Sequence, residues 1–527
     1  MRKFLSFPIF LFILFSLSAC DKTKSTVTET PILSVSYIEN SFLLTWTNFP
    51  ENQSGYAVFF AGQAIEDFTT PYSTCESETH VLQITENFEI GKTYHFAVTL
   101  ADNTNVKAVA TFVITPEAAG SNNFKIIMED GVAHMYKNGE PFFIQGIGGD
   151  TQLSRAASYG ANAYRTWDGD ANDLTTRQLE NARDNNMYLM MGIWLSHNRA
   201  DYTREVYKTQ QRNKINRLLD AYKSHPHLMI WCLGNETDAG ANTQAAWEFI
   251  DELAGIIKAA DPNHPVATVV THNLSALNNI ARYTTNFDVV GLNTYGGIYG
   301  MESMFSRSEY DGPYMVTEWG PNGFWENGNT SWGAPIEPTS ENKRIEYEKR
   351  YTDFILNNDR SIGSFVFLWG QKQERTPTWF SMFVESGVEG LPINGEACPT
   401  VETMEKLWTN AEPKERAPVV DGITMNGKAV RETEPFAAGS VVRAVVNAHD
   451  PRDYELEFHW EILKEATDLG TGGSYEPRPD RVGAVVSGSS PEQDITVPTS
   501  AGNYRLFVYV LNGRGMVGTS NIPFQVE

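Results

Sequence analysis

Short apolar strands alternate with amphipathic helices over the middle of the chain, from about residue 124 to residue 412. Helical spacing of three and four residues is clearest at Ile215, Leu218, Leu219 and Tyr222 and again at Trp247, Ile250, Ala254 and Ile257. The strands predicted between the helical stretches are 142–146, 161–166, 188–195, 228–233, 266–271, 289–293, 314–317 and 364–368. Eight strand–helix units in about 290 residues have the size of a (β/α)₈ barrel.

Both flanks of this region show the pattern of short strands separated by turn residues. Residues 30–117 carry a Trp on an early strand, 42–47, and a Gly-Lys-Thr-Tyr sequence before a late one, 93–98, which resembles a fibronectin type III sandwich. Residues 413–527 contain strands such as 502–510 and resemble an immunoglobulin-like or PKD-type domain. We therefore expect a multidomain chain with a central (β/α)₈ barrel, residues 124–412, between two β-sandwich domains.

Composition supports a folded protein and argues against one class of partner. Of the 527 residues, 41% are hydrophobic and 20% are charged, an ordinary balance for globular domains. The net charge of −24 makes the chain a poor ligand for polyanions, so no nucleic acid is expected as a partner. The 12 tryptophans offer surfaces on which sugar rings can stack, although most aromatic residues of any protein belong to its core.

The first 29 residues have the features of an export signal. A basic start, residues 1–3, precedes a short apolar run, residues 4–17, that is too short to span a membrane. Leu17-Ser18-Ala19-Cys20 then resembles a bacterial lipobox, which implies a signal peptide over residues 1–20, lipidation of Cys20 and a tether over residues 21–29. The alternative is an ordinary signal cleaved after Ala19. We expect a protein held by its lipid anchor at the bacterial cell envelope, on a membrane face that the sequence leaves open.

The remaining cysteines and the familiar motifs give little sign of other chemistry. Cys75, Cys232 and Cys398 are widely spaced, form no Cys-x-x-Cys pair and are interpreted as unpaired. Gly146-Ile147-Gly148-Gly149 lacks the spacing of a dinucleotide loop and is interpreted as a tight turn. We expect no metal and no organic cofactor.

Two glutamates stand directly after predicted barrel strands. Glu236 follows the fourth strand in Gly234-Asn235-Glu236, and Glu318 follows the seventh in Thr317-Glu318-Trp319. The carboxyl ends of the strands form the active-site face of such a barrel, so both carboxylates are expected at one mouth. Glycoside cleavage needs this pair, one group to protonate the leaving oxygen and one to attack the anomeric carbon. For a single glutamate, a salt-bridge partner is an equally good interpretation.

An Asn-Glu pair after strand 4 and a Glu after strand 7 resemble the signature of clan A glycoside hydrolases, which include families 2 and 5. The resemblance covers residues 124–412 and implies that Glu236 is the acid/base and Glu318 the nucleophile of a retaining enzyme. The large sugar-binding domain that precedes the barrel in family 2 enzymes is missing from this sequence. The resemblance also implies a β-linked substrate, such as a glucan, mannan or galactan.

Four further strand-end residues match positions of the clan. By this resemblance Arg165 lies beside the nucleophile, Asn235 binds the sugar 2-hydroxyl, Tyr295 touches the nucleophile, and Trp369 forms an aromatic floor under the sugar. Each has a structural alternative: an ion pair for Arg165, a turn cap for Asn235, a barrel-rim tyrosine for Tyr295 and core packing for Trp369.

Other residues are candidates by position alone. His197 and His272 follow the third and fifth strands and are interpreted as substrate contacts or as structural histidines. Trp167 and Trp319 flank the predicted mouth and can line subsites or belong to the core. The polar segment 371–376 either recognises substrate or is a solvated loop, and Asp238 is interpreted as a surface residue rather than a modulator of the Glu236 pKa.

The sequence therefore predicts a retaining glycoside hydrolase that cleaves β-linked glycans by double displacement. A carbohydrate substrate and a membrane lipid anchor are the expected partners, and no protein partner is predicted. The alternatives are a transglycosylase of the same clan, a glycan-binding lipoprotein with a non-catalytic barrel, and a structural envelope protein.

Overall fold

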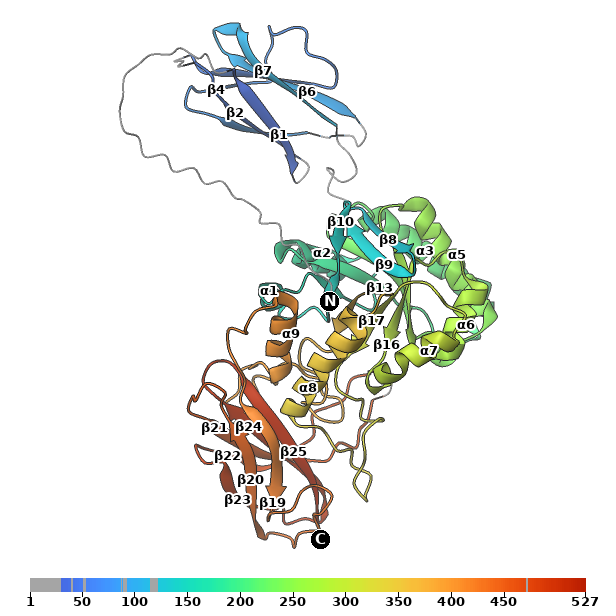
Figure 1. Cartoon of the computed structure of the whole chain (residues 1–527), viewed down its shortest axis with the longest axis vertical. Helices are drawn as coiled ribbons and strands as arrows, with labels where there is room; N and C mark the ends of the chain where they lie inside the picture. The colour runs from blue at the N-terminus through green and yellow to red at the C-terminus, as the bar shows by residue number, and fades with distance from the viewer. Residues whose placement is uncertain are drawn as a thin grey trace, which may run out of the picture. The chain divides into compact units, whose positions relative to one another are not determined.

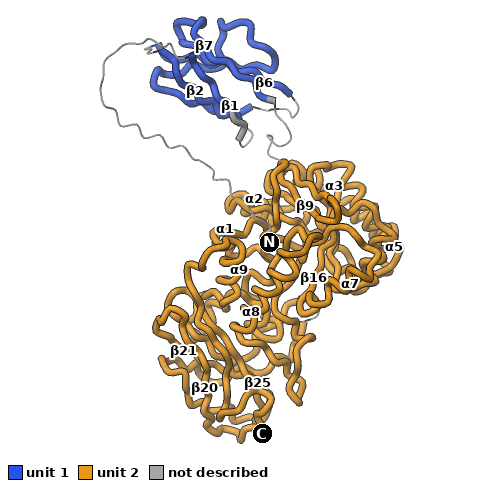
Figure 2. The backbone as a smooth tube through the Cα atoms, viewed as in Figure 1, with its two compact units in different colours: residues 1–115 blue, residues 116–527 orange. Residues whose placement is uncertain are grey.

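The computed structural model describes residues 30–527 apart from 39–40, 51–53, 87, 89–91, 114–121 and 471–472. The chain divides into two compact units, residues 1–115 and 116–527 (Figure 2). The predicted signal peptide with Cys20 and the predicted tether lie outside the described residues. Over the described part of the chain, no helix has the length and apolarity that crossing a membrane requires.

The first unit is a β-sandwich. One sheet has the order β1-β2-β5 and the other β4-β3-β6-β7, a division into three and four strands that fits the predicted fibronectin III-like architecture. Trp46 on β2 is 1% exposed and packs edge-on against Tyr56 of β3, so the early-strand tryptophan is a core residue. The strands are β1 (Ile32–Ile38), β2 (Ser41–Thr47), β3 (Tyr56–Ala61), β4 (Ser73–Cys75), β5 (Val81–Thr85), β6 (Thr93–Leu100) and β7 (Asn103–Val113).

The second unit contains a closed barrel of eight parallel strands in sequential order, β11 to β18, which confirms the predicted fold. The barrel strands are β11 (Ile144–Gly148), β12 (Ala163–Arg165), β13 (Tyr188–Ile193), β14 (Leu228–Asn235), β15 (Val266–Thr271), β16 (Val289–Asn293), β17 (Tyr314–Trp319) and β18 (Ser361–Val366). Two predicted strands are displaced. The first was expected to begin at Phe142, which instead ends the preceding strand β10, and the eighth was expected to extend to Leu368, but β18 ends at Val366.

Helices follow each barrel strand, and Figure 1 shows α3, α5, α6 and α7 on the outside of the barrel. All eight residues of the two predicted helical stripes are buried on α3 and α5. Several helices begin at a residue whose side chain accepts a backbone hydrogen bond, for example Asn172 before α2 and Thr243 before α5. The helices are α1 (Leu153–Ser158), α2 (Asp173–Asp184), α3 (Glu205–Tyr222), α4 (Asp238–Ala241), α5 (Gln244–Ala260), α6 (Leu274–Tyr283), α7 (Met301–Arg307), α8 (Ser340–Arg350) and α9 (Pro399–Thr409), with shorter helical segments η1 (Asp201–Thr203), η2 (Gly296–Gly300) and η3 (Tyr351–Leu356).

An antiparallel sheet, β8 (Phe124–Glu129), β9 (Val132–Lys137) and β10 (Glu140–Phe142), packs on the amino-terminal end of the barrel. Phe124 and Met135 of this sheet share one apolar cluster with Met190 and Met229 from the barrel strands. That end of the barrel is closed by packing, so the opposite end is left for a site.

The C-terminal domain is a second sandwich, with sheets β19-β20-β23 and β22-β21-β24-β25. Its strands are β19 (Val419–Met425), β20 (Val441–His449), β21 (Glu457–Lys464), β22 (Arg481–Gly488), β23 (Glu492–Thr496), β24 (Gly502–Leu511) and β25 (Val517–Val526). Val384 and Ile393, from the segment that follows β18, share an apolar cluster with Phe507 and Tyr509 of β24. The barrel and the C-terminal sandwich therefore have a common core.

A buried polar network strengthens this junction. The carboxylate of Glu337 accepts hydrogen bonds from Lys343 (2.5 Å), Thr376 (2.6 Å), Thr378 (2.8 Å) and Asn521 of β25 (2.6 Å). Burial by itself would raise the pKa of Glu337, but the charges of Lys343 and Arg505 and the hydrogen bonds from Lys343 and Thr376 outweigh it and lower the pKa. The loops after β17 and β18 are thus fastened to the C-terminal sandwich.

Candidate active site

Glu236 stands at the carboxyl end of β14. Gly234 and Glu236 both have left-handed backbones, with φ of 78° and 51°, and the amide of Glu236 donates to the carbonyl of Val269 on β15. The carboxylate accepts a hydrogen bond of 2.9 Å from Nδ2 of Asn293, the last residue of β16. Burial and then the charge of Glu318 raise the pKa of Glu236 from 4.5 to about 7. A carboxyl with this pKa is suited to give and take a proton near neutral pH.

Glu318 lies on β17 and is 8% exposed. Its Oε1 accepts a hydrogen bond of 2.9 Å from the indole of Trp167 and contacts Arg165 at 3.4 Å, and its Oε2 accepts one of 3.1 Å from the hydroxyl of Tyr295. Three side chains from two strand ends, Arg165 and Trp167 at the end of β12 and Tyr295 after β16, therefore orient this carboxylate.

Arg165 ties the strand ends together. Its side chain is fully buried and donates to the carbonyl of Thr317 (2.8 Å) and to the side-chain oxygens of Asn235 (2.9 Å) and Asn293 (3.3 Å). The structure thus places Arg165 beside Glu318, as predicted, and in the same network as the Asn235-Glu236 pair. Asn293 also belongs to this network and was not predicted. Its position as the last residue of the sixth strand could have indicated a place at the barrel mouth.

Asn235 and His272 line one cavity with both glutamates. The amide oxygen of Asn235 accepts from Arg165 and from Asn293 (2.9 and 3.2 Å), which directs its Nδ2 group elsewhere. His272 contacts the hydroxyl of Thr294 through Nδ1 (3.1 Å), and burial lowers the pKa of its imidazole. A neutral imidazole in this position is able to donate or accept a hydrogen bond.

The cavity measures about 990 Å³, at the upper end of ordinary ligand sites. Aromatic side chains form much of its wall, and Trp194 and Trp325 are the most exposed of them, at 40% and 57%. Glu326 also lines it and accepts hydrogen bonds from the backbone amides of Gly296, Gly297 and Gly323, which holds two loops together. Trp325 and Glu326 lie on a loop beyond a strand end, and Trp194 fell inside the predicted strand 188–195 rather than after it, so the strand pattern did not single them out.

Two sequence predictions about the site are corrected by the structure. Trp369 was expected to form the floor under the sugar, but its side chain is 0% exposed and packs against Phe383 and Trp408 in the core. Phe367, two residues earlier, lines the cavity instead. His197 was expected to contact substrate, but among the described residues it does not line the cavity. Its Nε2 lies 2.8 Å from the backbone carbonyl of Asn235, which it supports from behind.

The structure also decides between the alternatives left open for three other residues. Trp167 lines the cavity, whereas Trp319 is fully buried beneath it and stacks on Tyr351. Asp238 is 5% exposed rather than on the surface, accepts hydrogen bonds from Thr271, and adds a smaller like-charge contribution that raises the pKa of Glu236.

The polar segment 371–376 lies at the cavity and carries the ion pairs expected of it. Lys372, Glu374 and Arg375 line the cavity. Lys372 is paired with Glu374 at 2.8 Å, and Arg375 is paired at 3.1 Å with Glu476 of the C-terminal domain. Internal ion pairs therefore hold the segment against the cavity.

Residues 178–344 match the family model described as "Glycosyl hydrolases family 2, TIM barrel domain". The matched range contains Asn235, Glu236 and Glu318. A 74-residue stretch is 36% identical to a protein of Oryza sativa subsp. japonica named as a mannan endo-1,4-beta-mannosidase, and the match spans 13% of this chain and 18% of that protein.

Solved structures similar to this chain include a β-D-glucuronidase of Dictyoglomus thermophilum, with 16% identity, a TM-score of 0.42 and coverage of 73% of this chain and 69% of that one. A family 2 β-galacturonidase of Eisenbergiella tayi has 14% identity and a TM-score of 0.40, with coverage of 73% and 72%. At these values the structural likeness does not bear on the substrate of this chain. The family model matches part of the barrel and contains the paired glutamates, and it therefore supports the prediction of a clan A glycoside hydrolase barrel.

Proposed function

We propose that the chain is a retaining glycosidase that hydrolyses neutral, β-linked glycans by double displacement. The observation that carries this proposal is the carboxylate pair at the ends of β14 and β17, joined through the Asn293–Arg165 network and set in one cavity. One carboxyl of the pair has a pKa raised to about 7, and the other is held by three donors. Environments that differ in this way separate an acid/base from a nucleophile.

In the proposed reaction, Glu318 attacks the anomeric carbon and forms a glycosyl ester while the glycosidic C–O bond breaks. Glu236 gives its proton to the departing oxygen in the same step. Glu236, now ionised, takes a proton from water, and that water attacks the anomeric carbon and releases Glu318. The amide oxygen of Asn235 is engaged by Arg165 and Asn293, and its Nδ2 group is assigned to the sugar 2-hydroxyl.

The charges around the cavity favour a neutral sugar over a uronic acid. Lys372 and Arg375 line the cavity, and both are already paired with carboxylates. Glu318, Glu326 and Glu374 line it as well, so a substrate carboxylate would meet mainly negative charge. Aromatic walls suit the C–H faces of a neutral hexose.

A polysaccharide panel tests this proposal. Purified protein should release reducing sugar from at least one neutral β-glucan, β-mannan or β-galactan and not from polyuronides. Glu318→Ala should abolish release on every substrate, and Glu248→Ala, at an exposed position of α5, is the matched control. Binding of a glycan without any release would instead favour a glycan-binding protein with a non-catalytic barrel.

The roles of the two glutamates are tested separately. Glu236→Ala should retain the first step on aryl glycosides with good leaving groups, then stall, and azide should rescue it as the β-glycosyl azide because a small anion needs no general base. Proton NMR of the first sugar released by the wild type should show the β-anomer. An α-anomer would contradict the retaining assignment and the carboxylate spacing of about 5–5.5 Å that it requires.

We also propose, from Leu17-Ser18-Ala19-Cys20 alone, that Cys20 carries a lipid and anchors the protein at the cell envelope. Cells fed labelled palmitate should label the wild type, and Cys20→Ser should abolish labelling and release the protein from the membrane fraction. Absence of label on the wild type would contradict this proposal.

A further inference from the structure

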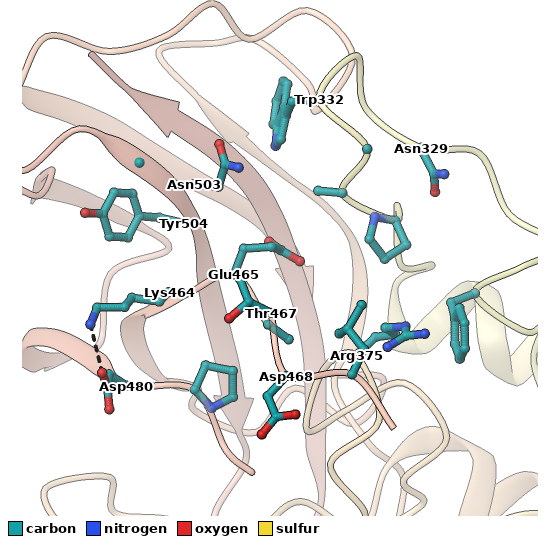
Figure 3. A pocket seen from close by; sticks show the side chains of 18 of the residues that line it. Asn329, Trp332, Arg375, Lys464, Glu465, Thr467, Asp468, Asp480, Asn503 and Tyr504 are labelled. Carbon is teal, nitrogen blue, oxygen red and sulfur yellow. Dashed lines mark hydrogen bonds and ion pairs between the residues drawn. The ribbon is translucent and has the colours of Figure 1, made fainter. Parts of the chain in front are cut away.

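A second cavity of about 1020 Å³ lies between the barrel and the C-terminal sandwich. Figure 3 shows Asn329 and Trp332 on the loop that follows β17, and Glu465, Asp468 and Asn503 on the C-terminal domain. Of the sequence candidates for the site, Arg375 of the polar segment 371–376 lines this cavity. Its walls come from segments more than a hundred residues apart in the sequence.

The second cavity adjoins the catalytic one. Phe324, Trp325 and Arg375 line both cavities. Trp325 stacks edge-on against Tyr295 at 5.5 Å, and Tyr295 hydrogen-bonds the carboxylate of Glu318. A short series of contacts thus leads from the proposed nucleophile to the shared wall.

The C-terminal domain contributes to the catalytic cavity too. Gly470, Gly473 and Ser474 line it. Nearby, the buried carboxylate of Glu476 accepts hydrogen bonds from the backbone amide (2.6 Å) and the guanidinium (3.1 Å) of Arg375. The guanidinium of Arg375 also lies 4.1 Å from the ring centre of Phe324. The wall shared by the two cavities is therefore fixed by the C-terminal domain.

The lining of the second cavity has the chemistry of a site for neutral sugars. Trp325 is 57% exposed, Trp332 is half-buried, and both offer aromatic surface for C–H faces of a sugar ring. Asn329, Asn503 and Thr467 offer amide and hydroxyl groups. Charged groups of the lining are paired, Lys464 with Asp480 of the same wall (2.8 Å) and Glu465 with Arg505 outside the lining (2.6 Å).

We propose that this second cavity continues the substrate cleft and binds sugar units of a neutral β-linked glycan beyond those nearest the cleaved bond. This inference rests on the proposed function and extends it, because an enzyme with such a cleft acts on chains rather than on single terminal sugars. The C-terminal sandwich is then part of the substrate-binding surface.

The test compares substrates of different length from the polysaccharide that the wild type hydrolyses best. We would measure kcat/KM for the disaccharide to the octasaccharide and for the aryl monosaccharide, which fills the catalytic cavity alone. Wild-type kcat/KM should rise with chain length. Trp332→Ala should lower the ratio of hexasaccharide to aryl-monosaccharide kcat/KM roughly two- to tenfold, the range expected for a lost aromatic contact.

Asn503 is exposed on the opposite wall, and Asn503→Ala should lower the same ratio. This second variant keeps the test decisive if Trp332→Ala fails to fold. Tyr136→Ala removes an aromatic side chain of β9, at the closed end of the barrel, and should leave the ratio unchanged. A wild-type rate that is independent of chain length, or ratios unchanged in both cleft variants, would overturn the inference. Absence of any hydrolysis by the wild type would overturn the proposed function instead.

Discussion

Replacing Glu236 by glutamine should stabilise the protein at alkaline pH and leave its stability nearly unchanged in acid. Glu236 is a half-buried carboxyl whose pKa is raised to about 7, first by burial and then by the charge of Glu318. Glutamine has the same shape, keeps an oxygen to accept the hydrogen bond from Asn293, and carries no charge at any pH. The substitution therefore removes the cost of ionising this group and little else.

The size of the effect follows from the two pKa values. The folded-state pKa of about 7 is above the ordinary value of 4.5 for a glutamate, so the folded protein holds the proton more tightly than the unfolded chain. The stability that protonation provides is complete below about pH 4 and is lost as the pH rises through 7. Since one pH unit corresponds to about 1.4 kcal/mol, the wild type loses about 3 kcal/mol across this interval, and Glu236→Gln does not.

Chemical denaturation of the two proteins between about pH 4 and pH 8 measures this difference. The unfolding free energy of Glu236→Gln minus that of the wild type should grow from near zero to about 3 kcal/mol. Glu248→Gln, at an exposed position, should show no such growth. A difference that stays constant with pH, or that shrinks as the pH rises, would refute the assignment of a raised pKa to Glu236.

Four other predictions follow from the site and its surroundings. Wild-type kcat/KM should fall as pH rises through about 7, because Glu236 must be protonated to act as an acid; a pH–rate profile that stays flat to about pH 9 would contradict this. In the wild type the hydrogen bond from Asn293 lowers the pKa of Glu236, so Asn293→Ala should raise that pKa and move the alkaline limb to higher pH; a move to lower pH would count against this. Trp369→Ala should lower the free energy of unfolding by about 3–5 kcal/mol, as for other buried tryptophans. A raised KM with normal stability would instead show that Trp369 contacts the substrate. Hydrolysis should survive exhaustive chelation, since the proposed mechanism uses carboxylates alone; a loss that added metal reverses would reveal a catalytic metal.

The barrel and its glutamate pair were predictable because parallel strands covered on both faces appear as continuous apolar runs. A polar residue that interrupts such a run marks a strand end, and all strand ends of a (β/α)₈ barrel lie on one face. That reasoning reached Glu236 and Glu318, and the structure places both in one cavity. The place of Arg165 beside Glu318 was implied by the family resemblance, and the structure ends the short strand β12 on this residue.

Residues whose position depends on tertiary packing were not predictable in this way. Phe367, Leu368 and Trp369 are three large apolar residues in succession after β18, and the local pattern does not say which one faces the cavity. Packing against Phe383 and Trp408 draws the tryptophan into the core and leaves Phe367 at the cavity. Trp325 and Gly470 reach the cavity from loops, and contacts distant in the sequence decide where those loops lie.

The apolar cluster and the Glu337 network that join the barrel to the C-terminal sandwich have a consequence for how the chain can be rearranged. A cut between residues 412 and 413 would separate Val384 and Ile393 from Phe507 and Tyr509, and Glu337 from Asn521. Exposing this surface would lose the free energy gained by burying these apolar side chains, and it would remove a hydrogen-bond donor from the carboxylate of Glu337. In recombination experiments, the barrel and the C-terminal sandwich should therefore be transplanted together, as a single exchangeable block.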